Sequence, residues 1–314
     1  MRRYMLVLAA LGACALVGVA FLRDMSAARS RAEALAKTFE GSRGAVQYAE
    51  VGDGTPVLSI HGAAGGFDQA LDMTGALAPR GYRLIAPSRF GYLGSAAPAA
   101  LTTESQADAY AELLDHLGID RANVVAISAG AWSAIQFAAR HPERCRALVL
   151  LVPADHLPPG AEIRGGALAD AMFKSDFVAW TAGKATGVAP GLLSATMLGT
   201  DAALLRAAPE AEKARVREVL EHLLPVSARR RGMQFDIATA ADRRSYPLEA
   251  IRCPVLAISA EDDLFGTAAR ARQIAGSVRE GRSVIFPTGG HALVGRHDEA
   301  LAVVDAFLAA HRTD

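Results

Sequence analysis

Short apolar runs rich in Val, Ile and Leu alternate with segments of helical periodicity from about residue 45 onward, and this alternation most constrains the fold. Helical spacing is clearest over residues 105–117 and 132–140. Strands that are apolar along their whole length and alternate with helices favour an α/β fold, with a mostly parallel, doubly wound sheet covered on both faces. The predicted strands are residues 45–51, 56–61, 82–86, 124–128, 147–152, 255–259 and 283–286.

One interval, residues 154–252, breaks this alternation, because it contains helical segments but no convincing strand. Such an interval between two strands predicts a helical insertion, and we expect it to cover the ligand site as a lid. An apolar stripe at helical spacing within it suits core packing and a substrate pocket equally well. The members of that stripe are Met172, Phe173, Phe177 and Trp180.

The N-terminal segment has a different character from the rest of the chain. An uncharged apolar run covers residues 4–22, and a helix rising about 1.5 Å per residue would span a bilayer core with it. The run is longer than the apolar region of a cleaved signal, which has about 7–15 residues. We therefore expect residues 1–25 to be an uncleaved membrane anchor, with a cleaved secretion signal as the alternative.

The remaining boundaries follow from composition. Cys14 ends a stretch that resembles a lipoprotein cleavage box, but the apolar run continues beyond it. Basic residues flank the run on both sides and discriminate little between orientations; we favour an extracytoplasmic folded domain. Residues 26–44 are expected to form a polar stalk, and residues 45–314 the domain.

Charge and cysteine content exclude several classes of function. The chain has 33 basic and 33 acidic residues and no basic stripe interleaved with aromatic residues, which argues against nucleic acid as a partner. Cys14, Cys145 and Cys253 are too few and too scattered for a disulfide scaffold or a zinc site. The basic run at residues 229–231 is expected to be solvated surface.

Ser128 lies where a predicted strand passes directly into a predicted helix, in the sequence Ala126-Ile-Ser128-Ala129-Gly130. Small residues on either side permit a very tight turn that projects the serine hydroxyl into a cleft. The helix N-terminus adds partial positive charge beside it. Because ligands of parallel sheets bind outside the carboxyl ends of the strands, this position predicts a nucleophile.

A Gly-rich turn, His61-Gly62-Ala63-Ala64-Gly65-Gly66, follows another predicted strand. Such turns expose backbone N–H groups, and acyl transfer needs two of them directed at the developing oxyanion. We expect the amides of Ala63 and Ala129 to serve as these donors. His61 and Gly62 are expected to support the loop, although a plain surface turn is the alternative.

Two later strands end in residues that could activate a serine. Asp263 closes the sequence Ala-Glu-Asp-Asp after residues 255–259, and His291 follows two glycines after residues 283–286. A serine hydroxyl needs a base to remove its proton, and the base needs a carboxylate to fix its tautomer. The chain order Ser, Asp, His predicts a catalytic triad of Ser128, Asp263 and His291.

Together these motifs resemble those of the α/β-hydrolase superfamily, over residues 45–310. Ala126 stands where the family usually has Gly, and Ser88 where it commonly has Asp. The resemblance implies a lid inserted after the sixth strand, here residues 154–252, and Asp263 as the catalytic acid. Asp262 and Asp155 remain rivals, because one is adjacent and the other follows the sixth strand.

The resemblance also implies a reaction. A serine nucleophile excludes the Asp-dependent chemistry of epoxide hydrolases and haloalkane dehalogenases, so we expect hydrolysis of a small apolar carboxylic ester through an acyl-enzyme, without a metal or organic cofactor. A hydrolase of carbon–carbon bonds in β-diketones and an acyltransferase remain alternatives on the same triad. A non-catalytic ligand-binding protein is the alternative from another class, but it would not need all three residues.

In the resembling fold the sixth and seventh strands are neighbours, and Cys145 and Cys253 come just before them. Adjacent strands lie about 4.8 Å apart, within the Cα range of a disulfide. We expect either a pair of buried thiols or, in an extracytoplasmic domain, a disulfide. The sequence carries no signal for the oligomeric state.

Overall fold

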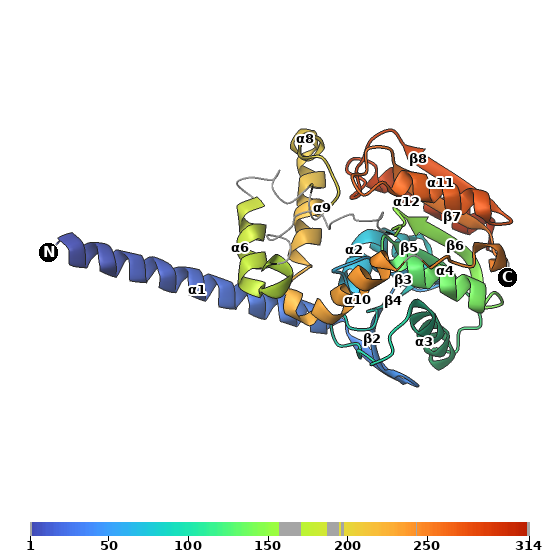
Figure 1. The fold of residues 1–314 in the computed structure, drawn as a ribbon, viewed down its shortest axis with the longest axis horizontal. Coiled ribbons are helices and arrows are strands. Elements are labelled where there is room, and N and C mark those ends of the chain that lie inside the picture. Colours follow the sequence, from blue (N-terminus) through green and yellow to red (C-terminus); the bar gives the residue numbers. More distant parts are fainter. Residues whose placement is uncertain (1, 157–170, 187–194, 196–197, 243, 313–314) are drawn as a thin grey trace.

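The protein is built on one eight-stranded sheet with the strand order β1-β2-β4-β3-β5-β6-β7-β8 (Figure 1). The structure, a computed structural model, describes residues 2–156, 171–186, 195, 198–242 and 244–312. Strands β3 to β8 pair in parallel, whereas β2 runs antiparallel to both β1 and β4. The strands are β1 Lys37–Gly41, β2 Gly44–Val51, β3 Thr55–Ile60, β4 Tyr82–Pro87, β5 Ala122–Ile127, β6 Cys145–Leu151, β7 Val255–Ala260 and β8 Gly281–Phe286.

Helices cover both faces of this sheet, as the apolar character of the central strands requires. One face packs on α3 (Thr103–His116), α4 (Gly130–Arg140) and α11 (Thr267–Ser277) in a core that includes Leu113, Phe137 and Ile274. The other packs on α2 (Phe67–Thr74), the 3-10 turn η1 (Gly75–Arg80) and α12 (His297–Ala310). The doubly wound α/β fold expected from the sequence is thus confirmed.

The helical insertion, residues 154–252, connects β6 to β7 at the expected place. Residues 157–170, 187–194, 196–197 and 243 of this interval lie outside the described residues. In Figure 1, α6, α8 and α9 lie together between α1 and the sheet. Its described elements are α6 Asp176–Thr186, α8 Ala202–Ala207, α9 Glu210–Glu221, η2 Val226–Ala228, α10 Arg230–Ala241 and η3 Leu248–Ala250.

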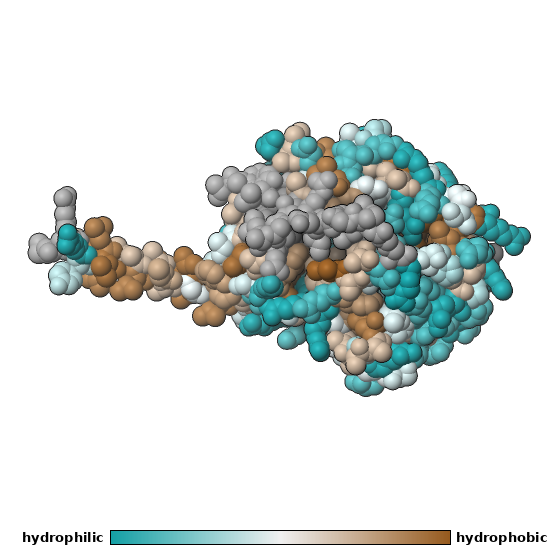
Figure 2. All heavy atoms as spheres, in the orientation of Figure 1, coloured by the Kyte–Doolittle hydropathy of each residue, from teal (hydrophilic) through white to brown (hydrophobic). Residues whose placement is uncertain are grey.

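The N-terminal helix α1 (Arg2–Ala34) projects from the body of the molecule, and its first half carries exposed apolar side chains (Figures 1 and 2). Leu8 and Leu16 are 68% and 73% exposed. By length and composition, the helix over Arg3–Ala34 can cross a membrane, with a mean hydropathy of 2.6 in its most apolar window. The expected apolar N-terminal helix is therefore present.

The expected polar stalk at residues 26–44 is wrong in this structure. Helix α1 continues through Ala34, with Met25, Ala28 and Ala32 buried against the body. Residues 37–41 then form the edge strand β1, which pairs with β2. Composition suggested a solvated segment because its polar residues outnumber the apolar ones; the small apolar stripe at three- and four-residue spacing is what packs.

Cys145 and Cys253 lie side by side at the amino ends of β6 and β7. Their Sγ atoms are 3.5 Å apart, and both are free, buried thiols. This is the buried thiol pair that strand adjacency favoured; no disulfide joins them in this structure.

Candidate active site

The chemistry-bearing residues meet at the carboxyl edge of the parallel strands. Ser128 follows β5, the loop from His61 to Gly66 follows β3, Asp263 follows β7 and His291 follows β8. Because β3, β5, β6, β7 and β8 run parallel in adjacent positions, all these loops emerge at one edge.

Ser128 occupies a strained turn between β5 and α4. Its φ angle is 48°, in the left-handed region that residues with a side chain rarely adopt. The sheet holds it there, since its N–H donates to the Leu151 carbonyl at 2.9 Å and its carbonyl accepts from the Ala154 N–H at 3.1 Å. A Cβ on Gly130 would lie 2.5 Å from the His61 carbonyl oxygen, so only glycine fits after the turn.

Ser128, His291 and Asp263 form one continuous hydrogen-bonded chain. The Oγ of Ser128 lies 3.0 Å from Nε2 of His291. Nδ1 of the same ring lies 2.8 Å from Oδ2 of Asp263. The carboxylate can accept only from Nδ1–H, which leaves Nε2 free to accept the serine proton.

Asp263 is buried, and its carboxylate accepts several hydrogen bonds. Besides His291, its carboxylate accepts from the Phe265 N–H at 2.8 Å and from the Thr267 hydroxyl. Burial opposes ionisation, but the His291 charge and these donors outweigh it, so the pKa of Asp263 lies below its ordinary value. The group is therefore ionised at neutral pH.

The two rival carboxylates are engaged elsewhere. Asp262 accepts from the Gly290 N–H at 2.8 Å and so positions the loop that carries His291. Asp155 lies 3.6 Å from Arg270 and accepts from the His156 N–H. Neither is hydrogen-bonded to the His291 ring.

Ala63 and Ala129 line the same cavity as Ser128. Among the described residues, neither N–H has a hydrogen-bond acceptor. Gly62 permits the close approach of the two loops, because a Cβ there would lie 3.1 Å from the Cβ of Ser128. Two unsatisfied donors beside a serine hydroxyl can stabilise an oxyanion.

His61 holds the Gly-rich loop after β3, residues 61–66, from within. Its Nδ1 donates to the Gly62 carbonyl at 2.7 Å, and its Nε2 accepts from the Arg89 N–H at 2.8 Å. Burial, reinforced by the nearby charges of Arg89 and Arg229, holds the pKa of His61 well below its ordinary value. The ring is therefore neutral, and both of its nitrogens are hydrogen-bonded.

A buried ion pair joins this loop to the helical insertion. Arg89, after β4, makes a bidentate contact with Asp236 on α10 at 2.6 and 2.7 Å, and both side chains are 4% exposed. Arg89 also donates to the Gly62 carbonyl at 2.9 Å, and the Tyr92 hydroxyl donates to Asp236. Burial opposes the charge of Arg89, but Asp236 outweighs it and raises the Arg89 pKa.

A second buried pair lies nearby. Arg229 contacts Asp68 at the start of α2 at 2.6 Å and also donates to the Gly65 carbonyl. The expectation that residues 229–231 form solvated surface is wrong for Arg229, which is 1% exposed. Its carboxylate partner lies 161 positions away along the chain, so no local pattern predicts the ion pair.

The residues that sequence reasoning missed are therefore Arg89, Asp236, Arg229 and Asp68. Arg89 follows Ser88, the position where the resembling family commonly has Asp, and this is the one available signal. The partner of Arg89 is 147 residues away. Pairing over such a separation is decided by tertiary packing.

Ser128 opens into a cavity of about 690 Å³ between the sheet edge and the insertion. That volume is within the usual range of about 300–1,000 Å³ for ligand pockets. Most of its wall is apolar, with Met73, Trp132, Phe173, Val219, Ile237 and Phe265 among the lining residues. The cavity suits an apolar ligand with one polar group near Ser128.

One group of side chains in the described part of the chain could hold a metal ion, and it lies away from Ser128. It consists of Asp72, Glu218 and His222, at the contact between α2 and α9. His222 and Asp72 are already paired at 2.7 Å. None of these three residues lines the cavity that Ser128 opens into.

Comparison with known proteins agrees with this geometry. The model of the alpha/beta hydrolase fold family matches residues 55–298. The uncharacterized hydrolase YcgS of Bacillus subtilis is 40% identical over 113 residues, which are 36% of this chain and 39% of that protein. The 2-hydroxy-6-oxo-6-phenylhexa-2,4-dienoate hydrolase of Comamonas testosteroni is 33% identical over 125 residues, covering 36% of this chain and 43% of that protein. The matches therefore span about two fifths of these relatives.

A solved structure extends the likeness over most of the chain. The alpha/beta hydrolase fold protein from Nakamurella multipartita is 29% identical, with a TM-score of 0.73. The match covers 87% of this chain and 99% of that one.

The Arg89–Asp236 pair generates a prediction about stability. Asp236→Ala leaves the Arg89 charge buried without its partner, so the free energy of unfolding falls by about 3–5 kcal/mol. Replacing both residues, Arg89→Met with Asp236→Leu, recovers most of that loss. Urea unfolding followed by circular dichroism measures both.

The matched control is Asp242→Ala, which breaks the exposed pair with Arg244 and changes stability little. An Asp236→Ala protein no less stable than this control would contradict a structural role for the buried pair.

Proposed function

The chain belongs to the α/β-hydrolase fold family, and from this premise we propose that it is a serine hydrolase that cleaves an apolar carboxylic ester. The observation that carries the proposal is the unbroken chain from Ser128 through His291 to Asp263, at 3.0 and 2.8 Å. A serine hydroxyl becomes a useful nucleophile when such a pair can take its proton.

In the proposed reaction, Ser128 Oγ attacks the ester carbonyl while its proton passes to Nε2 of His291. Asp263 stabilises the resulting imidazolium, and the Ala63 and Ala129 amides hold the oxyanion. The ester C–O bond then breaks, and the alcohol leaves with the proton from His291. Water, deprotonated by His291, attacks the acyl-enzyme and releases the acid and the free serine.

A second candidate reaction is hydrolysis of a carbon–carbon bond. It is favoured by the relative from Comamonas testosteroni, whose name denotes the hydrolysis of a hydroxy-oxo-dienoate. The same serine, base and oxyanion donors would serve both reactions, so the identity of the bond depends on the substrate that the cavity accepts.

Two further elements complete the proposal. The helical insertion acts as a lid, since α9 and α10 contribute Val216, Val219 and Ile237 to the cavity wall opposite the sheet edge. The first half of α1 anchors the enzyme in a membrane, because its exposed apolar side chains would otherwise face water. We place the domain on the extracytoplasmic side.

The nucleophile assignment predicts covalent labelling. A fluorophosphonate probe labels wild-type protein at Ser128, and Ser128→Ala abolishes both the labelling and the hydrolysis of p-nitrophenyl esters. Peptide mass spectrometry locates the label, and β-diketones assayed in parallel test the second reaction. Labelling that persists undiminished in Ser128→Ala would overturn the assignment.

The acid assignment predicts a contrast between two conservative substitutions. Asp263→Asn removes the acceptor that fixes the His291 tautomer, so kcat falls by about 10⁴-fold with little change in folding. Asp155→Asn, which alters only the contact with Arg270, has a small effect. Steady-state kinetics with a p-nitrophenyl ester measures both. A large loss of kcat in Asp155→Asn with a small loss in Asp263→Asn would assign the catalytic acid to Asp155, after β6.

The anchor assignment predicts the behaviour of the whole chain in membranes. Protein with its N-terminus intact sediments with membranes and resists carbonate extraction, because residues 4–22 span the hydrocarbon core. Protein that lacks residues 1–23 stays in the supernatant. Intact protein recovered in the soluble fraction would contradict the anchor.

A further inference from the structure

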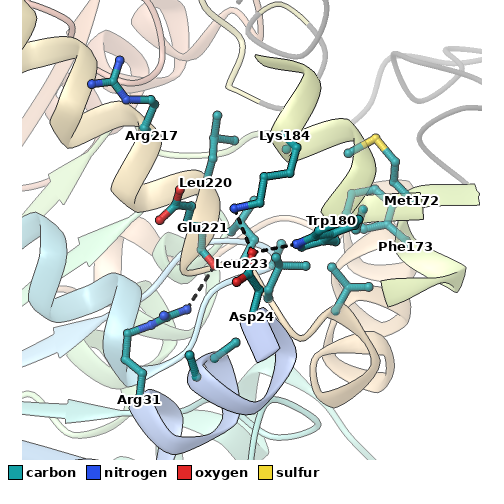
Figure 3. Close-up of a pocket in the computed structure, with 17 residues that line it drawn as sticks. Asp24, Arg31, Met172, Phe173, Trp180, Lys184, Arg217, Leu220, Glu221 and Leu223 are labelled. Atoms are coloured by element: carbon teal, nitrogen blue, oxygen red, sulfur yellow. Dashed lines mark hydrogen bonds and ion pairs between the residues drawn. The ribbon is translucent and has the colours of Figure 1, made fainter. Parts of the chain in front are cut away.

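A second cavity lies where the C-terminal half of α1 meets α6 and α9, and we call it the α1 pocket (Figure 3). Its volume is about 330 Å³. The wall combines Ala27 and Ala28 of α1, Trp180 and Gly183 of α6, and Leu220 of α9. The site proposed above uses none of these residues.

The polar groups at the edge of the α1 pocket largely bind one another. Asp24 accepts from Trp180 Nε1 at 3.0 Å and lies 2.9 Å from Nζ of Lys184 (Figure 3). Arg31 donates to the Glu221 carbonyl at 3.1 Å. These contacts tie α1 to the insertion and leave an apolar wall, formed by Met172, Phe173, Leu220 and Leu223.

The α1 pocket adjoins the Ser128 cavity. Ala64, Phe173 and Leu223 line both. These residues belong to one apolar cluster that also includes Ala63, the proposed oxyanion donor. The side chains between the two cavities are therefore apolar.

The α1 pocket also lies at the end of the apolar run of α1. Phe21, near the end of that run, packs edge-on against Phe177 and Trp180, with ring centroids 5.3 and 5.6 Å away. Asp24, in the next helical turn, already lines the pocket. A hydrocarbon chain leaving a bilayer that surrounds residues 4–22 would therefore reach the pocket with little exposure to water.

We propose that the α1 pocket binds the distal part of a long hydrocarbon chain whose ester carbonyl lies at Ser128, so that the substrates are long-chain esters that partition into membranes. This inference rests on the proposed ester hydrolysis and extends it beyond small esters. It also gives α1 a second role, because the helix that anchors the enzyme forms one wall of its substrate site.

The first test fills the pocket and compares chain lengths. Gly183 lines the pocket, and a Cβ placed there meets nothing within 4 Å, so Gly183→Phe directs a ring into open space. With whole protein in detergent micelles, we expect kcat/KM for p-nitrophenyl hexadecanoate to fall about tenfold relative to that for the butanoate.

Two further variants accompany this test: one is a control outside the α1 pocket, and the other fills the pocket from a different helix. Gly276→Phe makes the same change on α11. A Cβ at Gly276 also meets nothing within 4 Å, and Gly276 lines neither cavity, so this variant leaves the ratio unaltered. Ala27→Phe fills the pocket from the α1 side and repeats the effect should Gly183→Phe fold poorly.

The second test detects binding of the hydrocarbon chain in the α1 pocket without catalysis. The sequence has two tryptophans, Trp132 in the Ser128 cavity and Trp180 in the α1 pocket. In a Ser128→Ala, Trp132→Phe protein, brominated octadecanoic acid should quench Trp180 fluorescence saturably. The unbrominated acid should not quench, and Gly183→Phe should remove the saturable part.

The outcomes separate this inference from the proposed function. If kcat/KM falls equally for the hexadecanoate and the butanoate in Gly183→Phe and Ala27→Phe, and no saturable quenching is seen, the α1 pocket does not bind the hydrocarbon chain. Ester hydrolysis at Ser128 is unaffected by that result. Absence of ester turnover and of fluorophosphonate labelling in wild-type protein, with saturable quenching intact, overturns ester hydrolysis and leaves the chain site standing.

Discussion

The left-handed backbone at Ser128 is the constraint on which the site depends. A φ of 48° is unfavourable for a residue with a side chain, and it persists because the sheet fixes both sides of the turn. Gly130 lets α4 start against the His61 carbonyl, and Gly62 lets the loop after β3 approach the Cβ of Ser128. The same close packing brings the Ala63 and Ala129 amides to one cavity. Strain at one residue thus positions both the proposed nucleophile and its proposed oxyanion donors.

The helical insertion is held to this site by charge rather than by apolar contact alone. Arg89 and Arg229 each join a carboxylate and a carbonyl oxygen of the loop from Gly62 to Gly65. Buried pairs contribute less to net stability than their number suggests, because both partners lose their hydration. The hydrogen bonds of these pairs are directional, however, and they fix the loop from Gly62 to Gly65 relative to α10. The insertion and the loop from Gly62 to Gly65 are therefore held in a fixed relative position.

The C-terminal half of α1 packs against the folded domain and the insertion. Met25, Ala28 and Ala32 are buried, and Asp24 and Arg31 contact the insertion through side-chain hydrogen bonds. A segment that served only as a tether would not need these contacts. Packing of this kind fixes the direction of α1 relative to the folded domain.

The sequence by itself predicted the α/β fold and the ranges of seven strands, and it singled out Ser128, Asp263 and His291 as candidates. Apolar runs, a tight turn between small residues and chain order are local patterns that can be recognised without the structure. It did not determine β1, since Lys37–Gly41 has a single large apolar residue and pairs only as an edge. Nor did it determine that α1 packs on the insertion, or that Arg229 is buried rather than solvated. Tertiary structure decided these points. The ion pairs join residues 147 or 161 positions apart, and the spacing of Met25, Ala28 and Ala32 marks a helix face without indicating which surface covers it.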